Sequence, residues 1–579
     1  MRSAYARFRV HLTLSLAAMT AASGLAAAAD NGLAQKPLMG WTSWSHFHKH
    51  FTEATIKAQA DAMAARLKPF GYSYVNIDAG WRDPSKWDDF GREFWDVSKF
   101  PNGIAPVAAY VHSKGLKLGL YLHPGMDLGT NSPFERNTPI FGTAFHARDI
   151  TDSSQFGNTG KSAFRIDFSQ PGSSEYIQSY ADLMASWGVD YIKFDFVGPG
   201  GGTVPADDRV DMQHWLAALK NTPAGSRPIW IELSNSLSFA HAAEWRAVAN
   251  GWRIDGDIES GVSGTLTKWS NVAKRFADAP KWASFAGPGG WNDFDALPIG
   301  DGSGDGITSS ERRTTMTLWS IGCSPLILGA DLTQLDSADL ALITNSEVIA
   351  VNQAGRVATP VSQASSQQVW RVANGDGSHT VALFNLGSST ATVSAHWSDL
   401  GFSGPASVRD LWSHSELGSF NDGFSASLAS HASRLLRVTP ATAALSEEAE
   451  ALSFKAGGAA ASIQNDTKTS GGHWVQLAAD GAGDFIDYTL PALPAGSYQL
   501  KLQWKGNNNR GTLSLSVDGA PLGGSLDQYS ATQTYPTTTF GTLTFTSAAA
   551  HTVRLTATGR NQASSGLNLS ADRFVLLPQ

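Results

Sequence analysis

Two carboxylate-bearing segments of the sequence have residue types and spacing that suit nucleophilic and acid–base chemistry. The first is residues 190–195, where an apolar, strand-like run ends in Asp195. Lys193 and Asp195 are two residues apart, so both side chains point the same way from an extended strand. A cation beside Asp195 would keep its carboxylate ionised and nucleophilic. The alternative interpretation is a structural Lys–Asp pair at the end of a strand.

The second segment is residues 252–258, which carries Asp255 and Asp257 on either side of Gly256. The glycine indicates a loop just past a strand, from which a carboxyl group could reach into a site. Spacing alone does not choose between the two aspartates, and either could instead cap a turn. Glycoside hydrolysis is one chemistry that needs two carboxyl groups, about 5–5.5 Å apart in retaining enzymes. Asp195 with one of these aspartates would supply them.

Histidine and cysteine offer no comparable pattern. Histidines occur at alternate positions near the N-terminus and once at the end of a predicted strand (His46, His48, His50 and His123). They do not combine with a carboxylate at helical spacing in the way that a closed zinc site requires. The single cysteine, Cys323, lies in an apolar stretch and is expected to pack in a core. One cysteine also excludes an intramolecular disulfide.

The elements that must position these carboxylates alternate between short apolar runs and helical patterns. Eight strands are predicted at residues 38–41, 74–78, 116–122, 191–195, 228–233, 251–254, 282–285 and 325–328, with helical patterns such as 53–67, 103–114 and 174–187 between them. This order predicts a (β/α)8 barrel over residues 30–355. Polar side chains follow several strands, at the end where barrel enzymes build their sites: Asp78, His123, Asp195, Glu232, Arg253 and Asp257.

The remainder of the chain predicts two all-β domains. After residue 357 the helical pattern stops, and alternating runs at 368–372, 379–385, 390–397 and 433–438 predict an antiparallel β-sandwich over residues 356–440. A Thr/Ala/Ser-rich linker at 439–446 leads to further alternating runs at 483–489, 497–504, 512–517 and 551–557. These predict a second β-sandwich over residues 446–579.

The N-terminus and the charge balance limit where the protein works and what it binds. Arginines, an apolar stretch and three alanines before Asp30 predict a signal peptide over residues 1–29, and hence a secreted or periplasmic protein. The apolar stretch is too short for a membrane anchor, and no later segment is long enough to span a bilayer. A net charge of −8 without a basic stripe gives no reason to expect nucleic acid as a partner.

Several motifs in order resemble glycoside hydrolase family 27, the α-galactosidase or melibiase family. They are Met39-Gly40-Trp41-Thr42-Ser43-Trp44, residues 74–81, 188–195 and 252–257, Gly287-Pro288-Gly289-Gly290-Trp291-Asn292-Asp293-Phe294-Asp295, Pro325-Leu326-Ile327-Leu328-Gly329 and residues 408–412. The resemblance covers about residues 38–440. It implies an oligosaccharide or polysaccharide substrate and no cofactor for catalysis.

Residue by residue, the resemblance makes Asp195 the nucleophile and selects Asp257 over Asp255 as the general acid/base. It places substrate-binding roles on Trp41, Asp78, Lys193, Glu232, Arg253 and Asp295. Two departures concern the pocket. The family usually has paired aspartates where this chain reads Asp78-Ala79, and His123 begins a segment that differs from the family's third strand. We therefore also count His123 among the residues that shape substrate binding.

The third domain resembles a carbohydrate-binding module of family 35 or family 6. In that resemblance, Glu448, Glu450 and Asp572 correspond to carboxylates that hold a structural Ca²⁺. Trp474 and Trp504 are candidates for a sugar platform, with core packing as the alternative.

These expectations lead to three functional hypotheses. The first is an exported, retaining exo-α-galactosidase. The second keeps the chemistry but changes the sugar: an enzyme releasing isomaltose from an α-1,6-glucan, or a β-L-arabinopyranosidase, because the loss of an aspartate at Ala79 weakens hydroxyl recognition. The third is a non-catalytic sugar-binding protein, which has no physical need for both Asp195 and Asp257.

Overall fold

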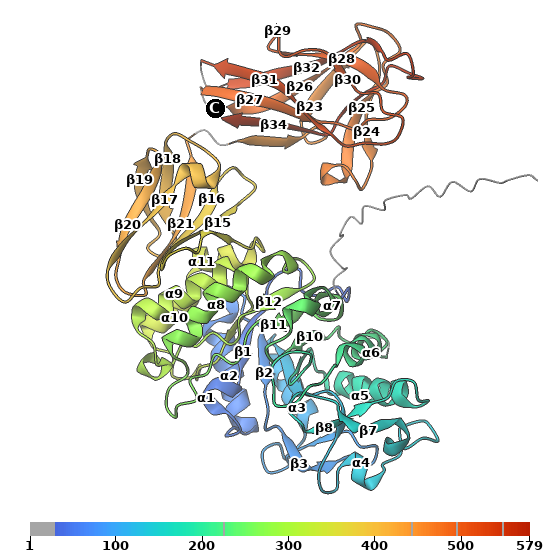
Figure 1. Ribbon diagram of the computed structural model, residues 1–579, viewed down its shortest axis with the longest axis vertical. Coiled ribbons are helices and arrows are strands. Elements are labelled where there is room, and N and C mark those ends of the chain that lie inside the picture. The colour runs from blue at the N-terminus through green and yellow to red at the C-terminus, as the bar shows by residue number, and fades with distance from the viewer. Residues whose placement is uncertain (1–28, 224–225, 442–443, 494–495, 547–548, 579) are drawn as a thin grey trace, which may run out of the picture.

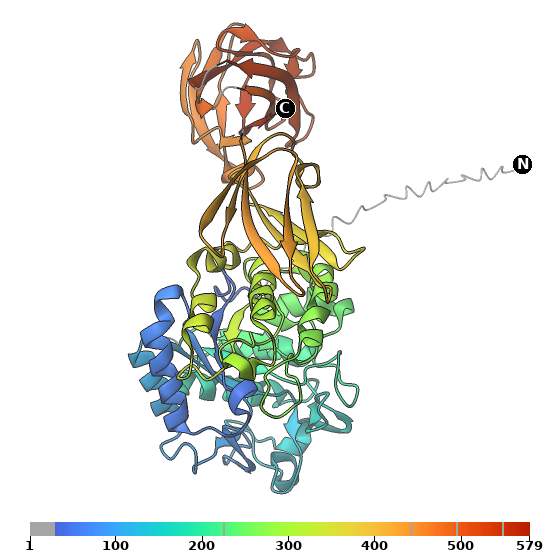
Figure 2. The same cartoon turned by 90° about the vertical axis from the view of Figure 1, so that its left-hand side faces the viewer.

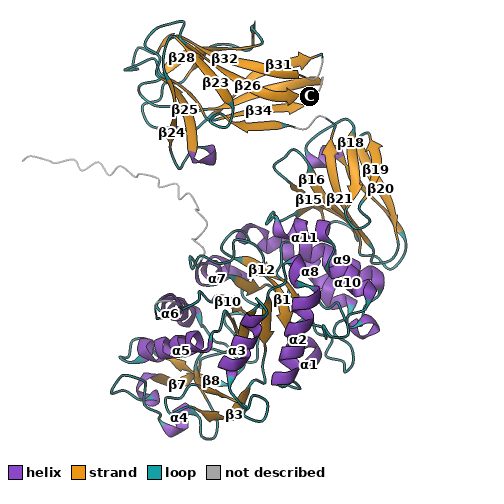
Figure 3. Ribbon diagram, turned by 180° about the vertical axis from the view of Figure 1, so that it is seen from behind, coloured by secondary structure: helices purple, strands orange, loops and turns teal. Residues whose placement is uncertain are grey.

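The computed structural model describes residues 29–223, 226–441, 444–493, 496–546 and 549–578. All but the last residue of the predicted signal peptide lies outside these ranges. The described chain forms three successive bodies, a mixed α/β body followed by two bodies made of strands (Figures 1 and 2). Figure 3 shows nearly all helices in the first body. The predicted fold class is confirmed.

The first body is built on an eight-stranded parallel sheet of the (β/α)8 type. Its order is β12-β11-β10-β9-β5-β2-β1-β13, and a parallel bridge between Leu297 and Leu328 links the segment after β12 to β13. The strands are β1 (Met39–Thr42), β2 (Tyr74–Ile77), β5 (Lys117–Leu122), β9 (Tyr191–Phe194), β10 (Trp230–Leu233), β11 (Gly251–Arg253), β12 (Trp291–Asp293) and β13 (Leu326–Leu328). Because all eight run parallel, their carboxyl ends meet at one face of the body.

Helices cover the outside of this sheet. They include α2 (Glu53–Arg66), α3 (Ile104–Ser113), α5 (Ser173–Trp187), α6 (Arg209–Lys220), α7 (Ala242–Val248), α8 (Trp269–Trp282), α9 (Ser309–Ile321), α10 (Ser337–Ile343) and α11 (Ser346–Gln353), with the short α1 (Trp44–Phe47) directly after β1. Helix α9 begins with a reciprocal cap, in which Thr308 accepts from the Glu311 amide while Glu311 accepts from that of Thr308. The sequence fixes this start locally, independently of packing.

One predicted strand is wrong. Residues 282–285 end helix α8 and form a short 3₁₀ turn, η4 (Ala283–Phe285). The strand of this unit is β12, which lies inside the distinctive Gly-Trp-Asn-Asp motif. The apolar run misled the prediction because Trp282 continues the buried face of α8 together with Val272, Phe276 and Ala279.

The second body is an antiparallel β-sandwich with a hydrophobic core of its own, and the other face of its larger sheet joins the core of the first body. A six-stranded sheet of order β14-β15-β16-β21-β18-β19 faces the pair β17-β20. Their bounds are β14 (Thr359–Ser362), β15 (Gln367–Ala373), β16 (His379–Asn385), β17 (Ala391–His396), β18 (Ala406–Asp410), β19 (Ser415–Phe420), β20 (Gly423–Leu428) and β21 (Ser433–Pro440). Phe276 of α8 packs against Trp370 and Phe384 of this sheet. The continuous hydrophobic cluster predicts that the two bodies unfold together.

The third body is also all-β and has a hydrophobic cluster of its own. Its main sheets have the orders β22-β34-β27-β31, β23-β26-β32-β28-β29 and β24-β25-β33. The strands are β22 (Leu445–Glu448), β23 (Ser453–Gly457), β24 (Ala461–Asn465), β25 (His473–Leu477), β26 (Phe485–Leu493), β27 (Gly496–Gln503), β28 (Gly511–Val517), β29 (Ala520–Pro521), β30 (Leu526–Asp527, paired with β28), β31 (Thr537–Phe545), β32 (Ala549–Arg560), β33 (Leu569–Ala571) and β34 (Arg573–Pro578).

The two tryptophans considered as a sugar platform are buried in this body. Trp474 is 4% exposed and Trp504 is 6% exposed. The Arg510 guanidinium covers the Trp474 ring at 4.6 Å from its centre. Trp504 packs in the hydrophobic core of this body, and Trp474 lies beneath the Lys505 and Arg510 side chains. Among the residues that the structure describes, no helix combines the length and apolar character needed to cross a lipid bilayer.

Candidate active site

A cavity of about 210 Å³ lies where the carboxyl ends of the barrel strands meet. Six of the predicted site residues line it: Asp78, Lys193, Asp195, Arg253, Asp257 and Asp295. The other lining residues are Thr42, Trp44, Ser45, Lys49, Ala79, Tyr121, Phe196, Ser234, Asn235, Glu259 and Ala296. The two carboxylates predicted to do the chemistry thus face one space from different strand ends.

Asp195 follows β9 directly and is held by backbone on both sides. Its amide donates to the Leu122 carbonyl at 2.9 Å, and its Oδ1 accepts from the Phe196 amide at 2.9 Å. Phe196 has a φ of 57°, which turns the chain sharply away from the strand axis just past the carboxylate. Tyr121 on the neighbouring strand hydrogen-bonds Asp195; burial, with the nearby Asp195 and Asp78 carboxylates, raises the Tyr121 pKa well above its usual value. That hydroxyl therefore stays protonated as a donor.

Lys193 forms its ion pair with Asp78 rather than with Asp195. Its Nζ lies 2.9 Å from Asp78 Oδ2. Burial alone would lower the lysine pKa, but the Asp78 and Asp195 carboxylates outweigh it and the pKa is raised. Lys193 is thus a permanent cation on the cavity floor. The Asp78 carboxylate is 2% exposed, and its Oδ2 also accepts from Thr42 and Asn76.

Asp257 reaches the cavity from the loop after β11, and its side chain is 73% exposed. Arg253 Nη2 donates to its Oδ1 at 3.0 Å. Partial burial raises the Asp257 pKa, but Arg253 and Lys193 outweigh that effect and hold the pKa below its ordinary value. Asp255 is buried and turned away, paired with Lys274 of α8. Of the two aspartates that spacing left open, only Asp257 faces the cavity.

Asp295 fixes both Arg253 and the loop that carries Asp257. Its Oδ2 lies 2.6 Å from Arg253 Nη2 and accepts from the Ile258 amide at 2.7 Å. Its own φ of 86° places the carboxylate between these two donors. Because Ile258 adjoins Asp257, this carboxylate sets where the proposed acid can lie.

Three predicted site residues do not line the cavity. Trp41 is fully buried, and its indole donates to the Ala330 carbonyl at 2.7 Å. It alternates with Thr42, which does face the cavity, so its side chain leaves the strand on the other side. Glu232 is paired in register with Lys193 and also points into the barrel. Glu232 and Lys193 lie at the same level inside the barrel, below the cavity. The shorter glutamate does not reach the cavity and remains buried, with its Oε2 accepting from the Trp230 indole.

His123 lies in a separate buried cluster. Arg82 Nη2 is 3.1 Å from its Nε2, and the same guanidinium lies 3.1 Å from both Glu93 and Asp127. The expectation that His123 contacts substrate is therefore not supported, since Arg82 and Asp127 occupy its polar face. In the described chain, two groups of three ligand atoms lie close enough to hold a metal: Glu93–His123–Asp127 and Asp257–Glu259–Asp295. An arginine, Arg82 or Arg253, already supplies the cation in each.

Several cavity residues escaped the sequence reasoning. The segment directly after β10 presents Ser234 and Asn235 to the cavity in place of Glu232, and Asn235 has a φ of 101°. Glu259 lies two residues beyond Asp257, and its Oε1 accepts from Ser45 at 2.6 Å. Burial and the Asp295 carboxylate raise the pKa of Glu259 to about 7. The sequence signal that could have identified Glu259 as a cavity residue was its position in the same loop as Asp257.

Comparison with known proteins fits this geometry. The family described as alpha galactosidase A matches residues 36–138 and 154–354, and its C-terminal β-sandwich domain matches residues 364–438. The chain belongs to the α-galactosidase family of glycoside hydrolases. Enzymes of this family need no cofactor for catalysis.

Relatives within the family include enzymes that are named for different sugars. The chain is 32% identical to an α-galactosidase of Oryza sativa and 35% identical to one of Coffea arabica, over 71% of this chain and 86% and 95% of those proteins. A family 27 β-L-arabinopyranosidase from Geobacillus stearothermophilus superposes with a TM-score of 0.65 at 32% identity, covering 70% of this chain and 97% of that one. An α-galactosidase from Mortierella vinacea gives 0.56 at 28% identity, covering 72% and 100%.

Proposed function

We propose that the protein is a retaining exo-glycosidase that removes a terminal α-D-galactosyl residue from oligo- and polysaccharides. The observation that carries this proposal is the single cavity into which Asp195 and Asp257 project from different strand ends. A volume of about 210 Å³ is smaller than the roughly 300–1,000 Å³ of pockets for drug-sized ligands. It suits one terminal sugar ring and disfavours the release of a disaccharide such as isomaltose.

The proposed reaction has two steps. Asp195 attacks the anomeric carbon as the glycosidic C–O bond breaks, and the leaving oxygen takes the proton of Asp257. Asp257 then removes a proton from water, which attacks the same carbon and releases Asp195. Lys193 and Arg253 supply fixed positive charge beside the two carboxylates.

A second sugar is favoured by one feature of the cavity floor. Ala79 lines the cavity where the resemblance places a second aspartate. A β-L-arabinopyranosyl unit has the ring configuration of α-D-galactose without the hydroxymethyl group, so it needs no partner there. The structural likeness of this chain to the Geobacillus stearothermophilus β-L-arabinopyranosidase supports this alternative.

Rates on aryl α-D-galactoside, aryl β-L-arabinopyranoside and dextran would test the proposal, with the Asp195→Ala protein as control. We expect hydrolysis of at least one aryl glycoside with retained anomeric configuration, and a loss of at least about 10⁴-fold in the variant. Isomaltose released from dextran without aryl glycoside cleavage would refute the proposed sugar specificity. A variant with near-normal rate would refute Asp195 as nucleophile, and no turnover of any substrate would favour the sugar-binding protein.

For the third body we propose a carbohydrate-binding module with a structural Ca²⁺. Ser470 ties two of the predicted ligands together: its hydroxyl donates to Glu448 at 2.7 Å and its amide to Asp572 at 3.2 Å. Glu448, Glu450 and Asp572 each retain a buried carboxylate oxygen without a hydrogen-bond partner. Burial, with the neighbouring Glu448 and Glu450, raises the pKa of Asp572 to about 6. A divalent cation would relieve both effects, since Ca²⁺ prefers oxygen ligands. The three carboxylates are not among the described groups whose ligand atoms all lie within 4.8 Å of one another, so they would have to move closer together to bind the ion.

We also propose that the protein is exported, on the composition of residues 1–29. N-terminal sequencing of the protein isolated from its native host would test this. Cleavage before Asp30 is the expected result, and a mature protein that retains its first residues would refute it.

A further inference from the structure

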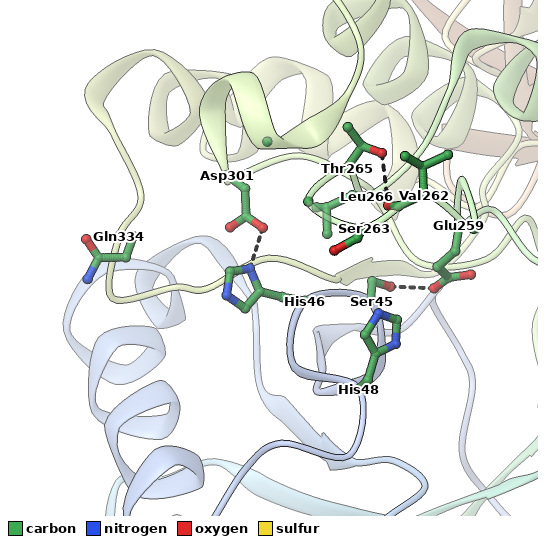
Figure 4. Close-up of a pocket in the computed structure, with 13 residues that line it drawn as sticks. Ser45, His46, His48, Glu259, Val262, Ser263, Thr265, Leu266, Asp301 and Gln334 are labelled. Atoms are coloured by element: carbon green, nitrogen blue, oxygen red, sulfur yellow. Dashed lines mark hydrogen bonds and ion pairs between the residues drawn. The ribbon is translucent and has the colours of Figure 1, made fainter.

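A second, larger cavity adjoins the catalytic one, and we call it the outer cavity. Its volume is about 650 Å³, and it is lined by Ser45, His46, His48, Glu259, the loop 261–266, Asp301, Gly304 and Gln334 (Figure 4). Ser45 and Glu259 line both cavities. Neither the proposed nucleophile nor the proposed acid needs this additional space.

Hydrogen bonds between distant segments hold the outer cavity in shape. Ser45, just after β1, donates to Glu259 of the loop after β11 at 2.6 Å. On the opposite side, His46 Nδ1 lies 2.5 Å from Asp301 Oδ2. Figure 4 shows these two pairs flanking the space, with Ser263 between them and Val262 on the side of Glu259. The cavity is therefore a built feature of three barrel loops.

The loop 261–266 is itself anchored at both ends. Ser260 Oγ hydrogen-bonds the Thr265 carbonyl at 2.7 Å, and the Leu266 amide donates to the Gly304 carbonyl at 2.9 Å. Between these anchors, Val262 is 62% exposed. An exposed apolar side chain beside carboxylate and imidazole groups matches a sugar, which offers both C–H faces and hydroxyl groups.

The chemistry of the proposed reaction says which part of a substrate would enter. A general acid lies on the side of the leaving oxygen, because that oxygen receives its proton. A carboxylate oxygen of Glu259 lies within 4.8 Å of one on Asp257, and Glu259 borders the outer cavity. A substrate whose terminal ring fills the catalytic cavity would therefore extend past Asp257 into the outer cavity.

We propose that the outer cavity binds the leaving-group part of the substrate as a short linear oligosaccharide, and that Glu259 positions its first sugar unit by accepting a hydroxyl hydrogen bond. The inference rests on the proposed glycosidase function and adds a preference for the leaving group. The outer cavity has about three times the volume of the catalytic cavity, which holds one ring, so it has room for more than one unit. In this proposal Glu259 binds the substrate and takes no part in either proton transfer.

The test compares two substrates that carry the same terminal sugar. One is a methyl glycoside, whose leaving group needs the acid but places no sugar unit in the outer cavity; the other is a tetrasaccharide whose three remaining units would fill the outer cavity. The measured quantity is kcat/KM for the tetrasaccharide divided by kcat/KM for the methyl glycoside. Because both substrates depend on Asp257 as acid, this ratio removes any loss of folded enzyme and any effect on the proton transfer.

Two variants perturb the outer cavity in different ways. Ser263→Trp fills it, and we expect the ratio to fall at least about tenfold. At pH 8, where Glu259 is ionised, Glu259→Gln removes the charge of one acceptor, and we expect a fall of roughly three- to tenfold, because a charged hydrogen bond is stronger than a neutral one. Ser186→Trp, an exposed site on α5 remote from both cavities, is the matched control and should leave the ratio unchanged.

A ratio within twofold of wild type in both cavity variants would overturn the proposal. So would an equal fall in Ser186→Trp. Failure of the proposed function looks different: the wild-type enzyme would then cleave neither aryl glycoside nor tetrasaccharide. If Ser263→Trp does not fold, the Glu259→Gln ratio decides alone.

Discussion

Substituting Ala79 with aspartate should turn the enzyme toward galactosides. Ala79 lines the catalytic cavity next to Asp78, whose Oδ2 already accepts from Lys193, Thr42 and Asn76. Asp78 Oδ1 accepts from the Ala79 amide at 2.8 Å. Asp78 therefore has little remaining capacity for sugar hydroxyl groups. A carboxylate at position 79 would add an acceptor where the hydroxymethyl group of galactose would lie.

The expected gain follows from the strength of one charged hydrogen bond. Such a bond contributes about 1.5–3 kcal/mol, equivalent to roughly 10–150-fold in kcat/KM. Repulsion from Asp78 reduces that gain, although the Lys193 cation paired with Asp78 offsets part of this repulsion. We expect the ratio of kcat/KM for aryl α-D-galactoside to that for aryl β-L-arabinopyranoside to rise about tenfold.

The control is Ala79→Leu, which adds the same number of side-chain heavy atoms as aspartate, in the same branched shape, without an acceptor. Both variants and the wild type would be assayed at one pH on the two aryl glycosides, with melting temperatures measured alongside. The leucine variant should lower both rates and leave the ratio flat or reduced. A ratio that changes less than threefold in Ala79→Asp, or rises equally in Ala79→Leu, would refute the view that a missing acceptor at this position sets the sugar preference.

Further predictions concern the acid, the loop beside it and the third body. Asp257→Ala should lose activity on oligosaccharides but keep activity on aryl glycosides with good leaving groups, and added azide should accelerate the hydrolysis of those glycosides. Asp255→Ala should instead lower the melting temperature and leave kcat unchanged. The opposite pattern would assign the acid to Asp255. Because Arg253 holds the pKa of Asp257 low, kcat/KM on oligosaccharides should fall as pH rises through the acidic range, whereas activated aryl glycosides should stay active to higher pH. Identical pH–rate profiles for the two kinds of substrate would count against Asp257 as the acid. Since the pKa of Glu259 rises from 4.5 to about 7 on folding, its contribution to stability is lost as pH increases between those values, and Glu259→Gln should gain melting temperature relative to wild type at pH 8 but not at pH 4. Deletion of the chain after residue 442 should spare aryl glycoside hydrolysis, as the third body has its own core; loss of the folded barrel would show a structural role. For the wild type, Ca²⁺ should raise the melting temperature of the third body and a chelator should lower it, with no such response in Asp572→Asn.

The barrel was predictable because most of its strands carry a local signal. Alternating apolar runs placed seven of the eight strands within a few residues of their observed positions. The exception, β12, is three residues long and polar in the middle, so the adjacent apolar helix end at 282–285 gave the stronger signal. Short strands of this kind are specified by their neighbours in the sheet, and a single sequence does not show those neighbours.

The sequence predicted which strand ends carry site residues, but it did not predict where each side chain points. Asp78, Asp195 and Arg253 could be found because a polar residue after an apolar strand marks the open face of a barrel. Glu232 fits the same rule but lies one layer below the rim, and its strand neighbour Lys193 reaches the cavity because its side chain is longer. His123 was misplaced because its partner Arg82 comes from a distant segment. Such partners are set by tertiary structure.

The charges around Asp257 connect the proposed acid catalysis to the filling of the outer cavity. In the free enzyme this carboxyl group is exposed and paired with Arg253, a state that favours the ion rather than the acid. An acid catalyst must hold its proton when the glycosidic bond breaks. A sugar chain that fills the outer cavity would remove water from Asp257 and bring its first unit against Glu259, and desolvation favours the neutral carboxyl group. The leaving group would thereby help to create the acid that expels it. Among substrates that need this acid, those that occupy the outer cavity should therefore keep their activity to higher pH.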